Sequence, residues 1–255
     1  MEDRSTAGAA ELLAGVDDAT KCPCIGSIYV AGVVADRATV DEWKALGVRD
    51  SKLLTRKRRD ELDRVIRASA RSYSILHIPP AVIDDKDLNL NEWEMVTFLR
   101  IVQNMLGRTE FPSVIVDNWE VSAAVFARRF DDIMSRRRAA ELKAKKVILR
   151  KKLLRSIEYV PEHYADENHV IVGAASILAR AGSDRQYDRL RKKFGDFGSG
   201  SPGDPRTRMF VWKHRNDPVP IIRTSWRTFK TLAALDSIYD DPWHMRRREK
   251  ADSSE

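Results

Sequence analysis

Residues 12–18 read Leu-Leu-Ala-Gly-Val-Asp-Asp, an apolar run that ends on two aspartates. A second run of this kind, Val-Ile-Val-Asp at residues 114–117, also places its aspartate last. Short runs rich in aliphatic and β-branched residues are typical of strands buried in a parallel sheet. Binding sites of α/β sheets open at the carboxyl ends of their strands. The pattern therefore indicates a functional role for Asp17, Asp18 and Asp117.

A purely structural interpretation of these aspartates is equally compatible with their spacing. Asp17 and Asp18 precede a turn, and Asp117 can close an Asx-turn. Asp166 lies shortly before an expected helix, where a carboxylate commonly caps the helix or interacts with its dipole. Spacing alone leaves both interpretations open.

The rest of the chain alternates between strand-like and helix-like segments. Further strands are expected near residues 28–34, 73–78 and 157–160, and helices after Thr55, over residues 90–106 and over residues 170–194. A Gly/Ser/Pro-rich loop at residues 195–205 precedes another helix and an extended segment at residues 221–226. Strands that alternate with helices after an initial hairpin predict the α/β class.

Composition narrows the class of protein. The chain has 45 Lys and Arg against 38 Asp and Glu, a net charge of +7 that suggests a polyanionic partner. No apolar run approaches the roughly 20 residues of a membrane span, and the N-terminal residues lack the apolar core of a secretory signal. Two cysteines, Cys22 and Cys24, exclude a disulfide framework and make structural zinc a poor interpretation. We therefore expect a cytoplasmic protein that does not enter membranes.

Seven short blocks occur along the chain in a fixed order. They are GVDDA at 15–19, RDSKLLT at 49–55, AD at 165–166, AASILAR at 174–180, GDFGSG at 195–200, DPRT at 204–207 and RTSW at 223–226. Together they resemble type 2 ribonuclease H, ribonuclease HII, in its archaeal form. The resemblance runs from about residue 15 to residue 228.

The resemblance implies an α/β fold of the RNase H-like type, with a mixed central β-sheet flanked by helices and a C-terminal helical extension. It divides the chain into an N-terminal extension at residues 1–14, a nuclease domain at residues 15–228, and a C-terminal helix and tail at residues 229–255. The implied activity is endonucleolytic cleavage of RNA within an RNA–DNA hybrid or a ribonucleotide-containing duplex.

The resemblance also implies that Asp17, Asp18, Asp117 and Asp166 are catalytic and hold two divalent cations, Mg²⁺ or Mn²⁺. These cations prefer hard oxygen ligands, so carboxylates are the side chains that such a site needs. Two cations about 4 Å apart can activate a water and stabilise the leaving 3′ oxygen of an in-line displacement. One residue departs from the family, which has Glu where Asp18 stands. The shorter side chain predicts slower catalysis or a shift in metal preference towards Mn²⁺.

Two loops expected to bind substrate also depart from the family. Thr20, Lys21 and Cys22 occupy the positions of a Gly-Arg-Gly loop whose backbone approaches the ribose 2′-hydroxyl. Close approach and positive φ are harder with side chains in place. Ser201 stands where the family has a Tyr that packs on a sugar beside the RNA-to-DNA junction. We therefore expect altered recognition of single-ribonucleotide junctions.

Three further residues are substrate-binding candidates. Ser51 and Lys52 match a family contact to a backbone phosphate, with a plain helix-preceding loop as the alternative. Arg180 occupies a position that the family usually fills with Lys, and a cation near the cleaved phosphate would stabilise transition-state charge.

A basic insertion that the resemblance does not explain covers residues 136–155. It contains ten Lys and Arg and one acid, Glu141, so it carries +9 while the rest of the chain sums to −2. Leu142, Leu149, Leu153 and Ile157 would share one face of a helix. We expect an amphipathic basic helix in which Lys143, Lys145, Lys146 and Arg150 bind nucleic-acid phosphates. A membrane surface or an acidic protein could also bind such a helix, and it could simply be a solvated face.

Two other functions stay open at the level of sequence. One is a catalytically impaired binding module that retains the fold, and the other is a nuclease for a different nucleic acid. No protein partner is indicated, and we expect a monomer.

Overall fold

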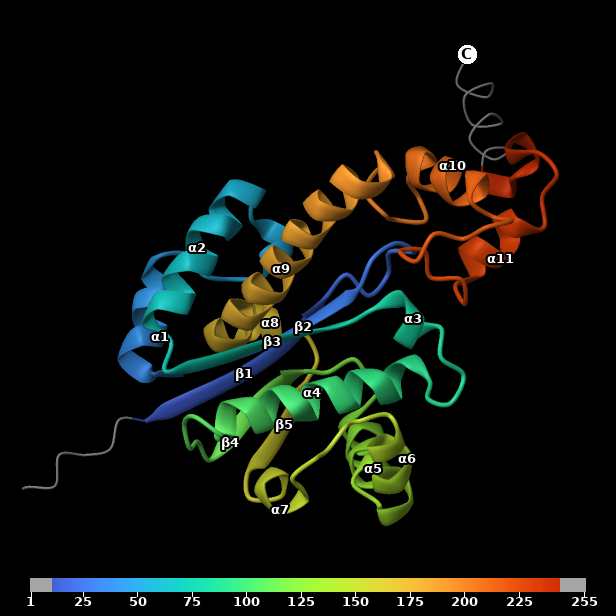
Figure 1. Ribbon diagram of the computed structural model, residues 1–255. Coiled ribbons are helices and arrows are strands. Elements are labelled where there is room, and N and C mark those ends of the chain that lie inside the picture. The colour runs from blue at the N-terminus through green and yellow to red at the C-terminus, as the bar shows by residue number, and fades with distance from the viewer. Residues whose placement is uncertain (1–10, 244–255) are drawn as a thin grey trace, which may run out of the picture. The chain divides into compact units, whose positions relative to one another are not determined.

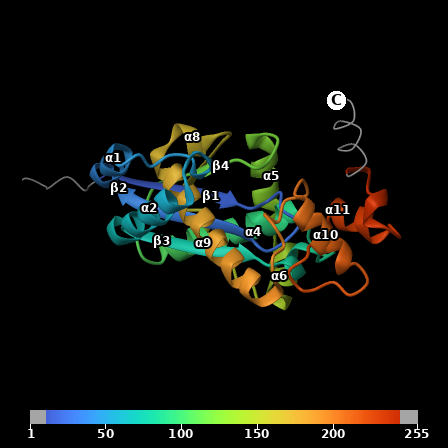
Figure 2. The same cartoon turned by 90° about the horizontal axis from the view of Figure 1, so that it is seen from above.

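The computed structural model describes residues 11–243. Its centre is a five-stranded sheet with the order β3-β2-β1-β4-β5. The strands are β1 (Leu12–Ala19), β2 (Ile28–Asp36), β3 (Ser72–Ile78), β4 (Ser113–Asp117) and β5 (Glu158–Glu162). Strand β4 pairs in parallel with both β1 and β5, whereas the arrows of β1 and β2 point in opposite directions in Figure 2. The sheet is therefore mixed, and its parallel half carries both aspartate-ending runs.

Eleven α-helices are assigned within the described residues. They are α1 (Arg37–Ala45), α2 (Arg56–Ser69), α3 (Pro80–Ile83), α4 (Leu90–Leu106), α5 (Ala123–Ile133), α6 (Arg136–Ala144), α7 (Lys151–Leu154), α8 (Ala165–Asn168), α9 (Val170–Phe194), α10 (Pro205–Lys213) and α11 (Arg227–Ala233). Two short 3₁₀ helices add Ser51–Leu53 and Ile238–Asp240. None of the helices in residues 11–243 is long and apolar enough to span a bilayer.

Two glycines let helices approach the sheet closely. A Cβ on Gly15 would lie 2.8 Å from the backbone of Ile171 in α9, and one on Gly32 would lie 2.6 Å from Ile101 in α4. Real Cβ atoms do not come so near, so both positions require glycine for this packing. Figure 1 shows α2 and α9 along one face of the sheet and α4 along the other. The result is a three-layer α/β arrangement.

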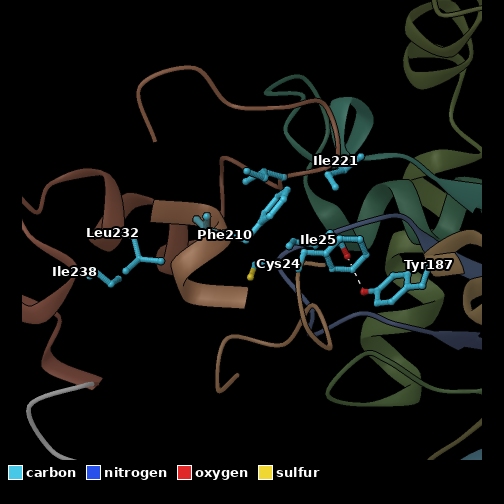
Figure 3. Packing of buried hydrophobic residues seen from close by; sticks show 10 residues of the cluster. Cys24, Ile25, Tyr187, Phe210, Ile221, Leu232 and Ile238 are labelled. Carbon is cyan, nitrogen blue, oxygen red and sulfur yellow. Dashed lines mark hydrogen bonds between the residues drawn. The ribbon is translucent and has the colours of Figure 1, made fainter. Parts of the chain in front are cut away.

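Two compact units make up the chain. Within the described residues, the first comprises residues 11–19, 30–76 and 94–181 and so contains most of the sheet; the second comprises residues 20–29, 77–93 and 182–243. A separate apolar core holds the second unit together (Figure 3), with Phe197, Phe210, Ile221 and Leu232 among its buried members. The Tyr187 hydroxyl donates to the carbonyl of Ile25 at 2.8 Å within this core.

The structure confirms most of the elements expected from sequence. The helices over residues 90–106 and 170–194 have the predicted bounds, and α2 begins after the Thr55 N-cap, whose side chain accepts from Arg58 N. The expectation of one continuous helix through the basic insertion is wrong. Lys146 has φ +60, a left-handed conformation that an α-helix does not contain, and the insertion therefore forms two short helices, α6 and α7. The predicted domain limits fall partly outside the described residues and stay a prediction.

Candidate active site

Two aspartates lie at the carboxyl edge of neighbouring parallel strands. Val16 of β1 pairs with Val116 of β4, so Asp17 and Asp117 follow at the same end of the two strands. A side chain that follows a buried Val in an extended strand points to the other face of the sheet. This shared register brings the two aspartate-ending runs together, as expected from sequence.

Asp166 reaches the same edge through a short turn after β5. Asp117 pairs in register with Glu162, the last residue of β5, and α8 begins three residues later. The backbone N–H of Ala165 donates to Asp117 Oδ1 at 3.0 Å, which ties the turn to the end of β4. Tyr164, immediately before, adopts a left-handed φ of +59. Asp166 is thus held by the strand end that carries Asp117.

Glu162 anchors the far side of this turn. Asn168 Nδ2 donates to Glu162 Oε1 at 2.8 Å, and His169 Nε2 lies 2.8 Å from Glu162 Oε2. These hydrogen bonds lower the pKa of the Glu162 carboxyl, with the contact to His169 contributing most. Sequence analysis did not select Glu162 as a site residue.

The four aspartates interact electrostatically. Burial raises the pKa of Asp17 well above its usual value, and the charges of Asp18 and Asp117 raise it further, with a smaller contribution from Asp166. The pKa of Asp117 is raised to about 6; burial is the largest cause, and the charge of Asp166 is the next. Carboxylates that raise one another's pKa lie close enough to repel, and a bound cation would offset that repulsion.

Lys52 provides a positive charge at this cluster. Its ammonium lies 3.3 Å from Asp166 Oδ2 and 3.8 Å from Asp50 Oδ1. Partial burial acts to lower the pKa of Lys52, but the charges of Asp166 and Asp50 outweigh it and the pKa is raised. The side chain is 76% exposed, so the ammonium also faces solvent. The residue expected to contact phosphate therefore contacts a carboxylate of the candidate site as well.

Two buried serines bond to each other, and one of them also hydrogen-bonds to Asp17. Ser51 Oγ and Ser176 Oγ lie 2.8 Å apart, and both residues are buried. A hydrogen bond from the Ser176 side chain partly offsets the raised pKa of Asp17. Sequence analysis did not single out Ser176, although it lies in the AASILAR block. Ser51 is thus a packing partner of that block in the structure.

The donor chemistry of the cluster fits a divalent cation. Four carboxylates supply hard oxygen ligands of the kind that Mg²⁺ and Mn²⁺ prefer. As the side chains stand, no three His, Cys, Asp or Glu residues within 11–243 form a ligand group for one ion. The assignment of these four aspartates as metal ligands therefore stays a prediction.

A buried arginine organises the loop of Thr20, Lys21 and Cys22 in the second unit. Arg223 is fully buried, and its guanidinium donates to the carbonyls of Gly26, Lys21 and Thr20 at 2.7–2.8 Å. Burial lowers the pKa of Arg223 to about 10. Thr20 adopts φ +66, so the left-handed conformation persists here although the residue is not glycine. The loop backbone is therefore fixed with three carbonyls directed at one side chain.

Asp84 holds Arg223's neighbours in place. Its carboxylate accepts hydrogen bonds from the backbone and hydroxyl of both Thr224 and Ser225, at 2.5–3.0 Å. Trp226 Nε1 donates weakly to the carbonyl of Cys22 at 3.4 Å. Asp84 lies far from these residues in sequence and belongs to none of the seven blocks, so nothing in the sequence pattern pointed to it.

The second substrate loop meets the first within the same unit. Cys24 N donates to the carbonyl of Gly200 at 2.8 Å, so the segments that contain Cys22 and Ser201 are joined. Ser201 forms a turn, in which its hydroxyl accepts from Gly203 N at 3.4 Å. Arg180 lies on α9 in the first unit and is half-buried. The predicted site residues thus form two groups, one in each unit.

Comparison with known proteins identifies the family. The sequence model described as Ribonuclease HII matches residues 14–229. The chain belongs to the ribonuclease HII family. A ribonuclease HII of Thermococcus onnurineus is 37% identical over 224 residues, which cover 86% of this chain and 89% of the relative.

Solved structures of the ribonuclease HII family share the fold. Ribonuclease H2 from Pyrococcus horikoshii has a TM-score of 0.72 at 29% identity, covering 87% of this chain and 97% of that chain. The ribonuclease HII in a PCNA complex from Archaeoglobus fulgidus has a TM-score of 0.71 at 29% identity, covering 89% and 98%. The expected RNase H-like fold with a mixed sheet and C-terminal helices is confirmed.

Proposed function

We propose that this protein is a metal-dependent endoribonuclease that hydrolyses the RNA strand of RNA–DNA hybrids by a two-metal mechanism. Membership of the ribonuclease HII family supports the reaction and the substrate class. The observation that carries the proposal is the mutual electrostatic influence of Asp17, Asp18, Asp117 and Asp166 at one strand edge. Buried carboxylates that raise one another's pKa at one end of the sheet indicate a site built for cations.

Each residue of the site has a role in this reaction. The four aspartates would hold two Mg²⁺ or Mn²⁺ ions, which when bound activate the attacking water and stabilise the leaving 3′ oxygen. Ser176 orients Asp17 by a hydrogen bond, and the Ala165 N–H orients Asp117. Lys52 balances negative charge at Asp166 and is exposed enough to contact a substrate phosphate.

We also infer that recognition of single-ribonucleotide junctions differs from that of the family. The carbonyls of Thr20 and Lys21 are engaged by Arg223, and Thr20 and Cys22 carry side chains where the family has glycine. Ser201 cannot supply the aromatic surface of the family's Tyr. With both features changed, a long hybrid becomes a better substrate relative to a duplex with one embedded ribonucleotide.

The test uses four labelled substrates with Mg²⁺ or Mn²⁺: a long RNA–DNA hybrid, a DNA duplex with one ribonucleotide, an RNA duplex and a DNA duplex. The expected result is cleavage of the long hybrid that is lost in Asp117→Asn, with no strong preference for the single ribonucleotide. Binding without cleavage would indicate a non-catalytic module. Strong preference for the single ribonucleotide would refute the altered recognition while leaving the nuclease proposal intact.

The basic insertion extends the proposed nucleic-acid contact. Lys143, Lys146 and Arg150 are exposed, and Lys145 is half-buried. Contacts from these side chains to phosphates would displace condensed counterions and give a steep dependence of affinity on salt. We also propose that the nuclease domain spans residues 15–228 and that the protein is a monomer.

A further inference from the structure

Ile148 projects from the basic insertion into solvent although it is a large aliphatic residue. Its exposed fraction is 71%. The backbone on both sides is fixed by one side chain of α4: Gln103 Nε2 donates to the carbonyl of Ile148 at 3.3 Å, and Arg150 N donates to Gln103 Oε1 at 2.6 Å. Val147 N also donates to the carbonyl of Leu142 at 2.8 Å. The apolar side chain is thus presented on an anchored backbone.

Cations lie on both sides of Ile148. Lys146 precedes it and Arg150 follows it, and both are exposed. A hollow of about 360 Å³ beside Ile148 is lined by aliphatic side chains together with Lys143 and Lys151. A second hollow of about 480 Å³ is lined by Arg150, Lys151 and Lys152 among others. The surface therefore consists of an apolar projection with positive charge around it.

The carboxylates of this region are engaged elsewhere. Glu141 pairs with Arg138, Asp132 with Arg138 and Arg137, and Asp131 with Arg155. Within residues 11–243, no ion pair joins a carboxylate to Lys143, Lys146 or Arg150. These three cations are available to an external anion. Lys143 belongs to α6 with the paired arginines, and Arg150 follows the left-handed turn at Lys146.

We propose that Ile148 and its flanking cations form a second contact with the duplex substrate, in which Ile148 packs in the minor groove and the cations hold the phosphates on either side. A hybrid approaches A-form geometry, whose minor groove is wide and shallow and displays sugar edges. A protruding aliphatic residue can enter such a groove, and minor-groove proteins insert apolar side chains there between base steps. The proposal rests on the proposed function, because it assigns the partner as the same hybrid.

The arrangement of charge favours a duplex over an acidic protein. A groove has a phosphate row along each edge, and the cations at positions 146 and 150 flank the apolar residue on both sides in sequence. A protein partner would need an apolar pocket for Ile148 surrounded by carboxylates. Binding of an acidic peptide instead of the hybrid is therefore one outcome that the experiment distinguishes.

The experiment measures the affinity of the full chain for a fluorescent long hybrid across a salt series, without divalent cations so that the hybrid stays intact. Ile148→Ala should weaken binding about fivefold at every salt concentration, since burial of an aliphatic side chain does not depend on counterions. The slope of affinity against salt should not change. A variant with Gln at Lys143, Lys145, Lys146 and Arg150 should instead flatten the slope. Val121→Ala is the matched control, because Val121 is 83% exposed and lies outside the insertion.

Three results would overturn the proposal. One is unchanged affinity of Ile148→Ala, and another is an equal loss in Val121→Ala. A third is unchanged hybrid affinity together with Ile148-dependent binding of a poly-glutamate peptide, which would mark a protein-docking surface. Hydrolysis at hybrid concentrations well below saturation is measured in parallel with a divalent cation, and the rate of Ile148→Ala should fall by about the same factor as its affinity. Absence of cleavage by the wild type would refute the proposed function, while the affinities would still report on Ile148.

Discussion

The ammonium of Lys52 lies 3.3 Å from Oδ2 of Asp166, a buried carboxylate of the candidate active site. The lysine comes from a 3₁₀ helix early in the chain, and the aspartate from the turn after β5. Lys52 supplies positive charge at the aspartate cluster, and its charge also lowers the pKa of Asp117 to a smaller extent. We therefore expect Lys52 to affect both the stability of the metal-free protein and the rate of hydrolysis.

Replacement of Lys52 should affect both properties. In Lys52→Met the cluster loses a neutralising charge, so the metal-free protein at pH 7.5 should unfold at a lower temperature, with a smaller deficit once Mn²⁺ is bound. The rate of hybrid hydrolysis at saturating metal should fall about 100-fold, because a phosphate contact is lost. Thermal unfolding and single-turnover cleavage measure the two effects. Lys57→Met, an exposed lysine of α2, is the control and should behave like wild type.

The pH dependence of metal-free stability should reveal Asp117. Its pKa is raised to about 6 in the folded protein, above the usual value of 3.8. The folded state then binds more protons than the unfolded state between these values, so the contribution of Asp117 to the unfolding free energy falls as pH rises from about 4 through 6. Asp117→Asn removes this contribution and retains an oxygen that can accept from Ala165 N.

We therefore expect Asp117→Asn to be more stable than wild type at pH 7.5 in EDTA, by about 1–2 kcal/mol, and equal to it near pH 4. Denaturant unfolding at the two pH values measures the difference. Saturating Mn²⁺ should reverse the order at pH 7.5, because only the wild type keeps four carboxylate ligands. A constant difference between the two proteins across this pH range would contradict the account.

The shorter side chain of Asp18 should limit catalysis with Mg²⁺. Mg²⁺ demands near-ideal octahedral geometry, so a carboxylate withdrawn by one methylene is disfavoured. Asp18→Glu should increase the hydrolysis rate in Mg²⁺ by about tenfold and narrow the advantage of Mn²⁺. A titration of both metals with both proteins makes the comparison. Equal rates of wild type and variant in each metal would show that the site has adapted to Asp18.

Arg223 should be required for the folding of the second unit. In Arg223→Gln the carbonyls of Thr20, Lys21 and Gly26 lose charged donors in a buried setting, which should lower the unfolding free energy by about 3 kcal/mol. Arg223→Lys should recover little of this unfolding free energy, because one ammonium cannot reproduce the planar set of donors of a guanidinium. Thermal unfolding compares both with Arg227→Gln, an exposed neighbour. Stability like that of the control would show that other contacts hold the loop.

The sequence was sufficient to predict the mixed sheet and the strands that carry Asp17 and Asp117, while the role of these aspartates stays a prediction. Apolar runs that end in aspartate specify strand ends, and parallel pairing then places Asp17 and Asp117 together, as the register of β1 and β4 confirms. The cap Thr55 predicted where its helix begins, because a capping side chain acts locally on the first turn.

Contacts between distant segments could not be predicted in this way. Asp84 meets Thr224 and Ser225, and Gln103 fixes the backbone of Ile148 and Arg150, through side chains that no local pattern distinguishes from ordinary surface residues. The basic insertion was predicted as one helix because its leucines fit a helical period. That pattern carries no signal for the left-handed conformation of Lys146, which follows the end of α6.

A two-metal hydrolysis directed by the four aspartates would leave defined chemical groups at the ends of the cleaved RNA strand. We predict that wild-type protein with Mn²⁺ cleaves a labelled long hybrid to leave a 3′-hydroxyl and a 5′-phosphate, because water attacks and the 3′ oxygen leaves. Asp117→Asn should leave the hybrid intact under the same conditions. Products ending in a 2′,3′-cyclic phosphate, or cleavage that persists in Asp117→Asn, would contradict the account.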